Sequence, residues 1–160
     1  MQKTIRLSDF KNAENPWRAA EEALRVSPGA TFVIEPGVYE IGTPLSRKTM
    51  ENVLFGAYGD NPEREMFRPD FPYDTGVRLD DMRDITVEAE GATLLIDGFM
   101  EPLSIRRSQN ITLRGLTIDH KRKPYSCARV SDWHKTPSGA AFTATFLDRY
   151  PVHKHTPMPG

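Results

Sequence analysis

Two short segments of this chain repeat one pattern of residues. Residues 84–87 read Asp-Ile-Thr-Val and residues 110–113 read Asn-Ile-Thr-Leu. Each copy is a β-branched run that opens with Asp or Asn, which is typical of a strand that follows a corner. The offset from Ile85 to Ile111 is about 26 residues, a length typical of one unit in a repeat architecture. The pattern therefore predicts an all-β chain folded as a right-handed parallel β-helix, a solenoid in which each turn adds a layer of strands.

Other short apolar runs fit the same scheme. Within each run the outer positions are apolar and the middle one is often Thr or Arg, as in a strand with one face turned inward. The predicted strands cover residues 31–34, 38–41, 77–79, 85–87, 93–96, 103–105, 111–113, 116–118 and 142–147, with a weaker copy at residues 52–56. Short strands joined by tight corners argue against a doubly wound sheet, which needs long helices between its strands.

One helix is predicted near the amino end, over residues 16–26. Asn15 can cap this helix, and Pro16 suits its first position. Trp17 and Leu24 then share one face at helical spacing. We expect the helix to cap the open end of the β-helix, although a surface helix of an α+β domain would show the same pattern.

Residues 58–80 interrupt the strands with prolines, charges and aromatic side chains. A long irregular insertion is usually functional or disordered, and the aromatic content here predicts an ordered loop over one face. We expect residues 1–160 to form the N-terminal portion of a single β-helix domain. A solenoid needs a terminal cap over its core, and none is evident, so we expect the domain to continue beyond residue 160.

Charge and cysteine content exclude some classes of function. The 21 Lys and Arg residues are balanced by 22 Asp and Glu residues, which disfavours a nucleic-acid partner. No apolar stretch reaches the roughly 18 residues of a membrane span, and no signal peptide is visible after Met1. We expect a cytoplasmic protein if Met1 is the native start, and an extracytoplasmic one if a signal peptide was removed. Cys127 is the single cysteine, which excludes an internal disulfide; we interpret it as a buried small side chain.

Three features of the first half occur together: Asp9-Phe10, the predicted helix, and Ile-Glu-Pro-Gly-Val-Tyr at residues 34–39. They resemble the entry to the pectate-lyase-like superfamily of right-handed parallel β-helices, in which Pro-Gly-any-Tyr after a strand is common. The resemblance implies the fold, and it does not by itself identify an enzymatic activity.

The second half carries a more selective pattern. It comprises residues 91–103, 108–113 and 116–119, followed by Pro124 and Val130. This stretch is similar to the amino-terminal rungs of the α-1,3-galactosidases of glycoside hydrolase family 110, and differs from them at residues 121–123 and 126–128. The resemblance implies an inverting glycoside hydrolase that acts on terminal α-linked galactose. Such an enzyme pairs an acid with a carboxylate about 6.5–9.5 Å away. In the family these aspartates lie on later rungs, so no catalytic residue is assigned to this sequence.

Asp119 and His120 end one predicted strand, at the place where sugar-binding loops attach to a β-helix. The Asp119 carboxylate could bind vicinal hydroxyls of a sugar, or it could cap the corner by accepting backbone N–H groups. Asp97 is expected in the equivalent place one turn earlier, about 5 Å from Asp119 across one strand spacing. That separation suits a retaining pair or a metal, and stacked aspartates are also commonly structural.

Tyr125, Asp132 and Trp133 are expected in exposed loops that follow this strand. Aromatic faces stack on the apolar faces of sugars, so these residues are predicted to bind substrate; packing against the rung surface is the alternative. His153 and His155 could face the same way, but no third ligand accompanies them, and neither a metal site nor a cofactor is predicted. The basic run at residues 121–123 could serve a polysaccharide lyase or could form a solvated corner.

Together these patterns favour the N-terminal part of a carbohydrate-active β-helix protein with an oligosaccharide or polysaccharide substrate. An α-galactosidase-like glycoside hydrolase is the preferred activity, and this chain alone is expected to lack the catalytic carboxylates. A polysaccharide lyase and a carbohydrate-binding or scaffold solenoid without turnover are the alternatives. Exposed strand edges at an uncapped end would also allow pairing into a homo-oligomer.

Overall fold

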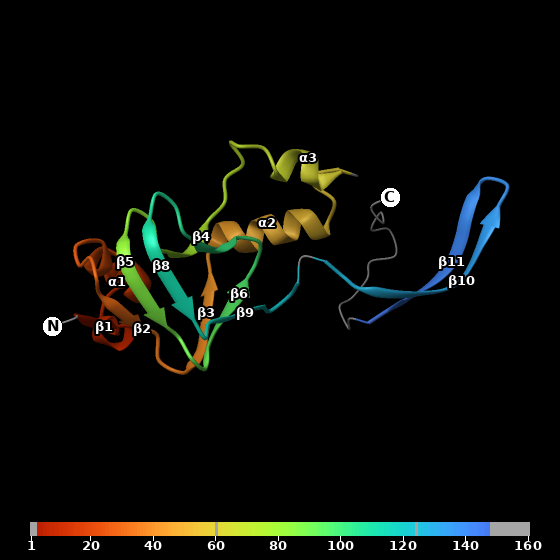
Figure 1. The fold of residues 1–160 in the computed structure, drawn as a ribbon. Coiled ribbons are helices and arrows are strands. Elements are labelled where there is room, and N and C mark those ends of the chain that lie inside the picture. The colour runs from red at the N-terminus through yellow and green to blue at the C-terminus, as the bar shows by residue number, and fades with distance from the viewer. Residues whose placement is uncertain (1–2, 60, 124, 148–160) are drawn as a thin grey trace.

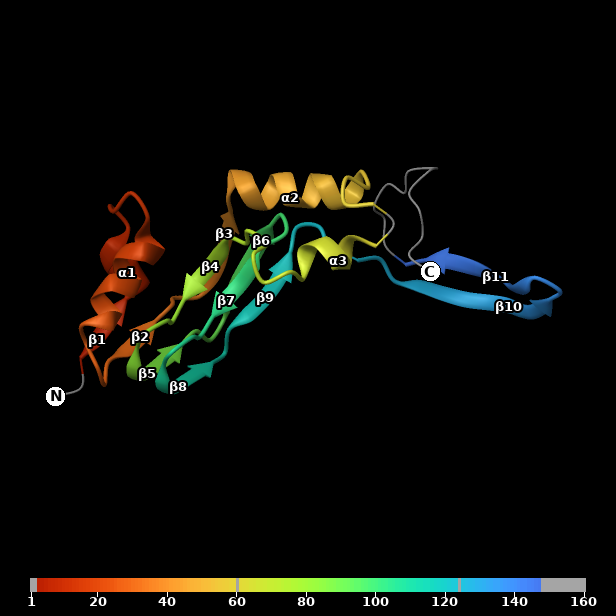
Figure 2. The same ribbon diagram turned by 90° about the horizontal axis from the view of Figure 1, so that it is seen from above.

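Strands dominate the computed structural model, which describes residues 3–59, 61–123 and 125–147. Most of these strands belong to parallel sheets (Figures 1 and 2). The first sheet has the order β1 (Thr4–Arg6), β2 (Thr31–Val33), β5 (Arg83–Glu88), β8 (Gln109–Arg114); the second has the order β3 (Gly37–Gly42), β6 (Ala92–Asp97), β9 (Thr117–His120); the third pairs β4 (Thr75–Arg78) with β7 (Glu101–Ser104). The chain visits the sheets in turn, and the prediction of parallel strands with few helices is confirmed.

The strand register turns the sequence repeat into a spatial repeat. Ile85 pairs with Ile111 between β5 and β8, so the spacing predicted from the two sequence copies is confirmed. The pair β4 and β7 keeps the same spacing, with Val77 opposite Leu103. Between β6 and β9, however, Leu94 pairs with Ile118, and the spacing is shorter because the paired positions Arg114 and Thr117 are two residues closer in sequence than Glu88 and Thr93.

The first passage of the chain through the three sheets contains more residues than the later passages. Thr31 of β2 pairs with Thr86 of β5, so this interval is more than twice the interval between Ile85 and Ile111. The extra length holds two helices between β3 and β4, namely α2 (Pro44–Leu54) and α3 (Pro62–Met66).

Among the described residues, a helix with the length and apolar character of a membrane span is absent.

The weak strand predicted at residues 52–56 is wrong, because these residues close α2. The helix starts from a reciprocal cap in which the Thr43 hydroxyl accepts the Ser46 N–H at 2.9 Å and the Ser46 hydroxyl accepts the Thr43 N–H at 2.8 Å. Pro44 stands in the first turn, where it lacks only an N–H that the helix does not use. The cap and Pro44 stabilise the first turn of α2, and the helix continues into the short apolar run that the sequence pattern indicated as a strand.

Contacts between aromatic rings order the predicted insertion at residues 58–80. Tyr58 contacts Phe71, Phe71 contacts Tyr73, and Tyr73 contacts Phe99, with ring centroids 5.6, 4.9 and 5.9 Å apart. The Tyr73 hydroxyl donates a hydrogen bond to the Met66 carbonyl at 2.7 Å, and burial raises the pKa of this phenol. The chain of rings fastens the loop after α3 to the segment between β6 and β7.

The helix predicted near the amino end is confirmed as α1 (Pro16–Arg25), and the Asn15 side chain accepts the Arg18 N–H at 3.1 Å. Ala20 and Leu24 face the core and are buried. The central side chains of this core, all at most 1% exposed, are Leu24, Phe32, Leu79, Ile85, Val87, Leu94 and Ile96. Burying each Leu, Ile or Phe contributes about 1.5–3 kcal/mol, so the inward columns of the parallel strands dominate the stability of this fold.

The corners repeat together with the strands. Asp84 and Asn110, which open the two sequence copies, both adopt left-handed backbone conformations, with φ of 57° and 55°. The Asn110 side chain donates to the Asp84 carboxylate at 2.7 Å. Asp81 and Arg107 are a second left-handed pair at the same spacing, joined by two hydrogen bonds of 2.6 and 2.7 Å. Asp and Asn tolerate this conformation better than most residues, which explains why they mark the corners.

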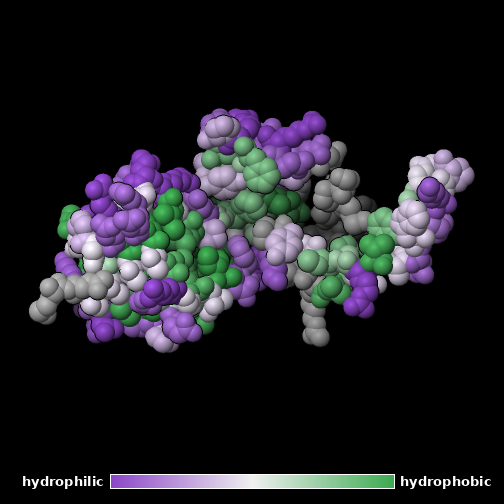
Figure 3. Space-filling model, in the orientation of Figure 1, coloured by the Kyte–Doolittle hydropathy of each residue, from purple (hydrophilic) through white to green (hydrophobic). Residues whose placement is uncertain are grey.

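The last described element is an antiparallel hairpin of β10 (Ala128–Thr136) and β11 (Gly139–Phe146). It extends away from the parallel sheets (Figures 1 and 2), and Figure 3 shows hydrophobic side chains at the surface near its start. The prediction that Asp132 and Trp133 lie in a loop is wrong, because both belong to β10 at a bulge between Ser131 and His134. Cys127, expected to be buried, is exposed.

Candidate functional site

The outer face of the sheet β3–β6–β9 carries Asp119. Side chains alternate along a strand, and the register places Glu40, Leu95 and Asp119 in one row across the three strands. The Asp119 carboxylate is exposed and accepts the N–H of His120 at 2.8 Å. Asp119 therefore performs the local capping expected of a corner aspartate while its carboxylate still faces solvent.

His120 points to the opposite side of the same sheet. It pairs with Ile96, which pairs in turn with Ile41, and both isoleucines face the core. The His120 Nδ1 atom is buried and has no hydrogen-bond partner among the described residues. Asp119 and His120, adjacent in sequence, thus occupy different faces and cannot hold one ligand between them.

Asp97 does not stack on Asp119 as the sequence suggested, because Leu95 is the residue opposite Asp119. The observed spacing between β6 and β9 exceeds the expected one by two residues, which moves Asp97 one outward position further along the face. There its carboxylate accepts the Arg47 Nε–H at 2.7 Å and lies 3.8 Å from Lys121 Nζ. Lys121 also bonds the Glu40 carboxylate, so opposite charges balance across this face.

The other predicted binding residues lie after β9. Tyr125, in the connection to β10, is 59% exposed, and Trp133 in the hairpin is also 59% exposed. The Asp132 carboxylate accepts the Ser131 hydroxyl at 3.1 Å. Among the described residues no hydrogen bond or ion pair joins Asp132 or Trp133 to Asp119, so the structure separates the predicted residues into a sheet group and a hairpin group. His153 and His155 lie outside the described residues.

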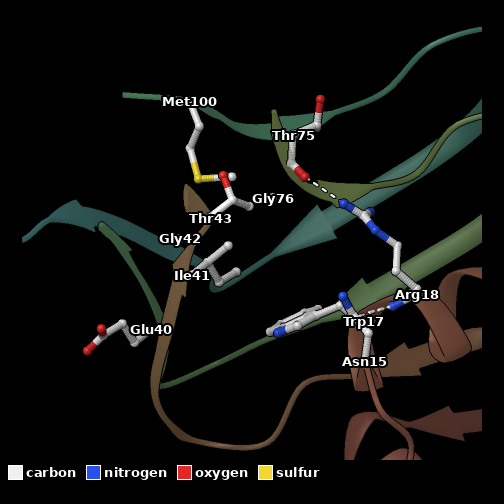
Figure 4. Close-up of a pocket in the computed structure, with 10 residues that line it drawn as sticks. All are labelled: Asn15, Trp17, Arg18, Glu40, Ile41, Gly42, Thr43, Thr75, Gly76 and Met100. Atoms are coloured by element: carbon white, nitrogen blue, oxygen red, sulfur yellow. Dashed lines mark hydrogen bonds between the residues drawn. The ribbon is translucent and has the colours of Figure 1, made fainter. Parts of the chain in front are cut away.

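A cavity of about 180 Å³ opens beside the start of α1, where β3 ends and β4 begins. Figure 4 shows Trp17, Arg18 and Met100 around it, with the Glu40 side chain directed away from them. The floor includes Ile41, which is 8% exposed, and Met100 is 6% exposed. Sequence patterns predicted Trp17 only as part of a helix face, and no motif indicated Met100.

The polar wall of this cavity is held in place by ion pairing. One Arg18 nitrogen donates to both carboxylate oxygens of Glu21 at 2.7 Å, and the other terminal nitrogen donates to the Thr75 carbonyl at 2.6 Å. Glu21 is only 4% exposed and also accepts the Arg78 N–H at 2.8 Å. A guanidinium anchored in this way is fixed before any ligand arrives.

The apolar wall is equally fixed. The Trp17 ring meets the Tyr39 ring edge-on, with centroids 5.6 Å apart. The Tyr39 hydroxyl donates to the Glu35 carbonyl at 2.8 Å, and burial, followed by the nearby Glu35 charge, raises the pKa of this phenol. In the part of the chain that the structure describes, no group of three or more His, Cys, Asp or Glu side chains is arranged to hold a metal ion.

Comparison with known proteins shows a distant, partial similarity to α-1,3-galactosidases. No family model matches the chain. The chain is 31% identical to α-1,3-galactosidase A of Bacteroides thetaiotaomicron over 91 residues, which cover 57% of this chain and 15% of that protein. It is 38% identical over 110 residues to an α-1,3-galactosidase B of Phocaeicola vulgatus, covering 55% of this chain and 18% of the relative. For α-1,3-galactosidase B of Akkermansia muciniphila the identity is 29%, with coverage of 71% and 13%. The chain thus spans less than a fifth of the length of these relatives.

Proposed function

We propose that this chain forms the N-terminal portion of a right-handed parallel β-helix belonging to the pectate-lyase-like superfamily, with α1 covering its first turn. The support is the repeated visit to the same sheets at nearly constant spacing, which pairs Val77 with Leu103, Ile85 with Ile111 and Leu94 with Ile118. Connections between parallel strands of one sheet are right-handed in about 98% of cases, which favours the right-handed form.

The activity that we propose is α-galactosidase-like glycoside hydrolysis of an oligosaccharide by the protein to which these strands belong, with inversion at the anomeric carbon. The observation that carries this proposal is the similarity to α-1,3-galactosidases of Bacteroides thetaiotaomicron, Phocaeicola vulgatus and Akkermansia muciniphila. Inversion needs an acid and a base on opposite sides of the sugar, which the family resemblance assigns to later rungs.

Substrate contacts are proposed for the outward groups of this chain. Asp119 offers an exposed carboxylate on the sheet face, while Tyr125, Asp132 and Trp133 offer aromatic and polar groups beyond it. His120 faces the core and is the exception among the predicted residues. Tyr125 and Trp133 would stack on apolar sugar faces, and Asp119 would accept hydrogen bonds from hydroxyl groups of the substrate.

One observation favours carbohydrate binding without turnover as a second candidate. Five carboxylates of the described parallel strands and their corners are engaged by cations: Glu40 by Lys121, Asp81 by Arg107, Glu88 by Arg114, Asp97 by Arg47 and Glu101 by Arg106. Carboxylates fixed in this manner stabilise a scaffold. The same pairing of Lys121 disfavours its use as the base of a polysaccharide lyase.

Galactose release tests the proposal. The protein expressed from the full gene is incubated with nitrophenyl α-galactoside and with a blood-group-B-type trisaccharide, and the first product anomer is read by NMR. We expect β-galactose as the first product, in keeping with inversion. Binding of the trisaccharide without release would support the second candidate, and unsaturated products from acidic polysaccharides would support a lyase.

A further inference from the structure

The cavity beside α1 contains hydrogen-bond donors that the protein itself does not use. Arg18 has five N–H groups, of which the contacts to Glu21 and Thr75 engage no more than three. The Trp17 indole N–H makes no hydrogen bond with any described residue. Trp17 and Arg18 line the same cavity as the apolar side chains of Ile41 and Met100 (Figure 4).

The charges around the cavity cancel. The Arg18 guanidinium is neutralised by the Glu21 carboxylate, and the Glu40 carboxylate by Lys121 on the outer face of the sheet. An anionic ligand would find no uncompensated positive charge among these described groups. A neutral ligand with oxygen acceptors fits both the balance of charge and the unused donors.

The volume of the cavity limits the size of the ligand that it can bind. An engineered cavity of about 150 Å³ accommodates a benzene ring, whereas pockets for drug-sized molecules measure about 300–1,000 Å³. At about 180 Å³ and open to solvent on one side, this cavity can cover about one six-membered ring of a ligand.

From these observations we propose that the cavity is a binding subsite for a single neutral pyranose ring. The apolar face of the sugar lies against Trp17, Ile41 and Met100, while its hydroxyl oxygens accept hydrogen bonds from the Trp17 indole and from Arg18. The proposal rests on the proposed function in one respect, the carbohydrate class of the ligand. It adds a location on α1 that is separate from Asp119 and from the hairpin.

The two tryptophans of the chain allow a direct test. Each gives one indole N–H resonance in a ¹⁵N-labelled sample, and the resonance missing from Trp17→Phe identifies Trp17. The chain is titrated with methyl α-galactoside, methyl α-glucoside and galacturonate. We expect a saturable shift of the Trp17 indole with a neutral glycoside and not with galacturonate.

Trp17→Phe keeps an aromatic ring in the core contact, and it removes the N–H donor together with part of the indole ring surface. It should weaken neutral glycoside binding at least about fivefold, the effect of one neutral hydrogen bond, as followed on the amides of Thr43 and Thr75. Phe67→Ala, at a residue 77% exposed and outside the cavity lining, is the matched control and should not change the affinity.

The alternative outcomes are distinct. A shift of the Trp133 indole alone would overturn the subsite while leaving the proposed carbohydrate function intact. A response of Trp17 to galacturonate only would overturn the neutral class of ligand. Saturation by neutral sugars that is equally strong in Trp17→Phe would overturn the role of the indole donor. No response of any resonance to sugars, combined with no galactose release by the full protein, would overturn both proposals.

Discussion

The parallel sheets and the β10–β11 hairpin both consist of paired strands, yet only the sheets bury their apolar side chains. Leu94 and Ile96 in β6 are fully buried, whereas Val130 and Trp133 in β10 are 55% and 59% exposed. In the sheets a strand pairs with another from the next visit of the chain, but the hairpin strands pair only with each other within the described residues. Pairing therefore sets the local form of a strand, while repetition at a nearly fixed spacing creates a core.

The largest contrast should come from cavity-forming substitutions in the two regions. Leu94→Ala removes a fully buried side chain and should lower the free energy of unfolding by about 2–5 kcal/mol. Val130→Ala, the matched change in the hairpin, should alter it by no more than about 0.5 kcal/mol. Urea unfolding followed by far-UV circular dichroism measures both values. Equal losses would show that the hairpin belongs to the same cooperative core.

Residues with a left-handed backbone conformation allow a second comparison of the two regions, with a smaller expected difference in stability. Asn110 in the corner before β8 and Asp132 in the hairpin bulge have φ of 55° and 53°. Alanine at either site should incur about 1–2 kcal/mol of backbone strain, but only Asn110→Ala should lower global stability by that amount, because the hairpin can open locally. Asn110→Gly relieves the strain and isolates the lost hydrogen bond to Asp84. A comparable global loss in Asp132→Ala would contradict the independence of the hairpin.

The smallest expected effect concerns the corner ion pair. The hydrogen bond from Arg107 holds the pKa of Asp81 below its ordinary value. A folded-state pKa below the unfolded one means that the pair stabilises the fold above the unfolded pKa of about 3.9, and that this contribution disappears as the pH falls through the folded pKa. Asp81→Asn tolerates the left-handed backbone and removes the charge, so melting temperatures at pH 7 and pH 3 should differ less in this variant than in the parent.

Asp132→Asn serves as the hairpin control for this pH experiment, because Asp132 forms no ion pair with a described residue. It should leave the difference between the two melting temperatures unchanged. An equal reduction in both variants would assign the pH dependence to overall charge instead of the Asp81–Arg107 pair.

Much of the fold could be predicted where local signals and tertiary pairing agree. Ile85 and Ile111 were matched correctly because nothing is inserted or deleted between their strands and corners. Asp97 and Asp119 were not, since the prediction matched two strand-end aspartates at a spacing of 22 residues, whereas the register pairs Leu95 with Asp119 at a spacing of 24. α2 was missed because a short apolar run at its end outweighed the capping signal at Thr43.

The candidate site was harder to predict than the fold. The exposure of Asp119 could be predicted because an aspartate at a strand end is visible in the sequence, but the inward orientation of His120 depends on register. The cavity joins residues as distant as Trp17 and Met100, which meet only when α1, β3 and β4 are assembled. In the hairpin, the charged residues around Trp133 and the bulge broke the alternation that would have marked β10 as a strand.

The parallel register is the claim on which this account depends, and nuclear Overhauser effects between backbone protons test it most directly. We expect cross-strand contacts that link Ile85 to Ile111 and Leu94 to Ile118, in the one-directional pattern of parallel strands. Close Hα–Hα contacts of antiparallel pairing at these positions, or pairing at any other spacing, would contradict the stacked repeat and the β-helix that we propose from it.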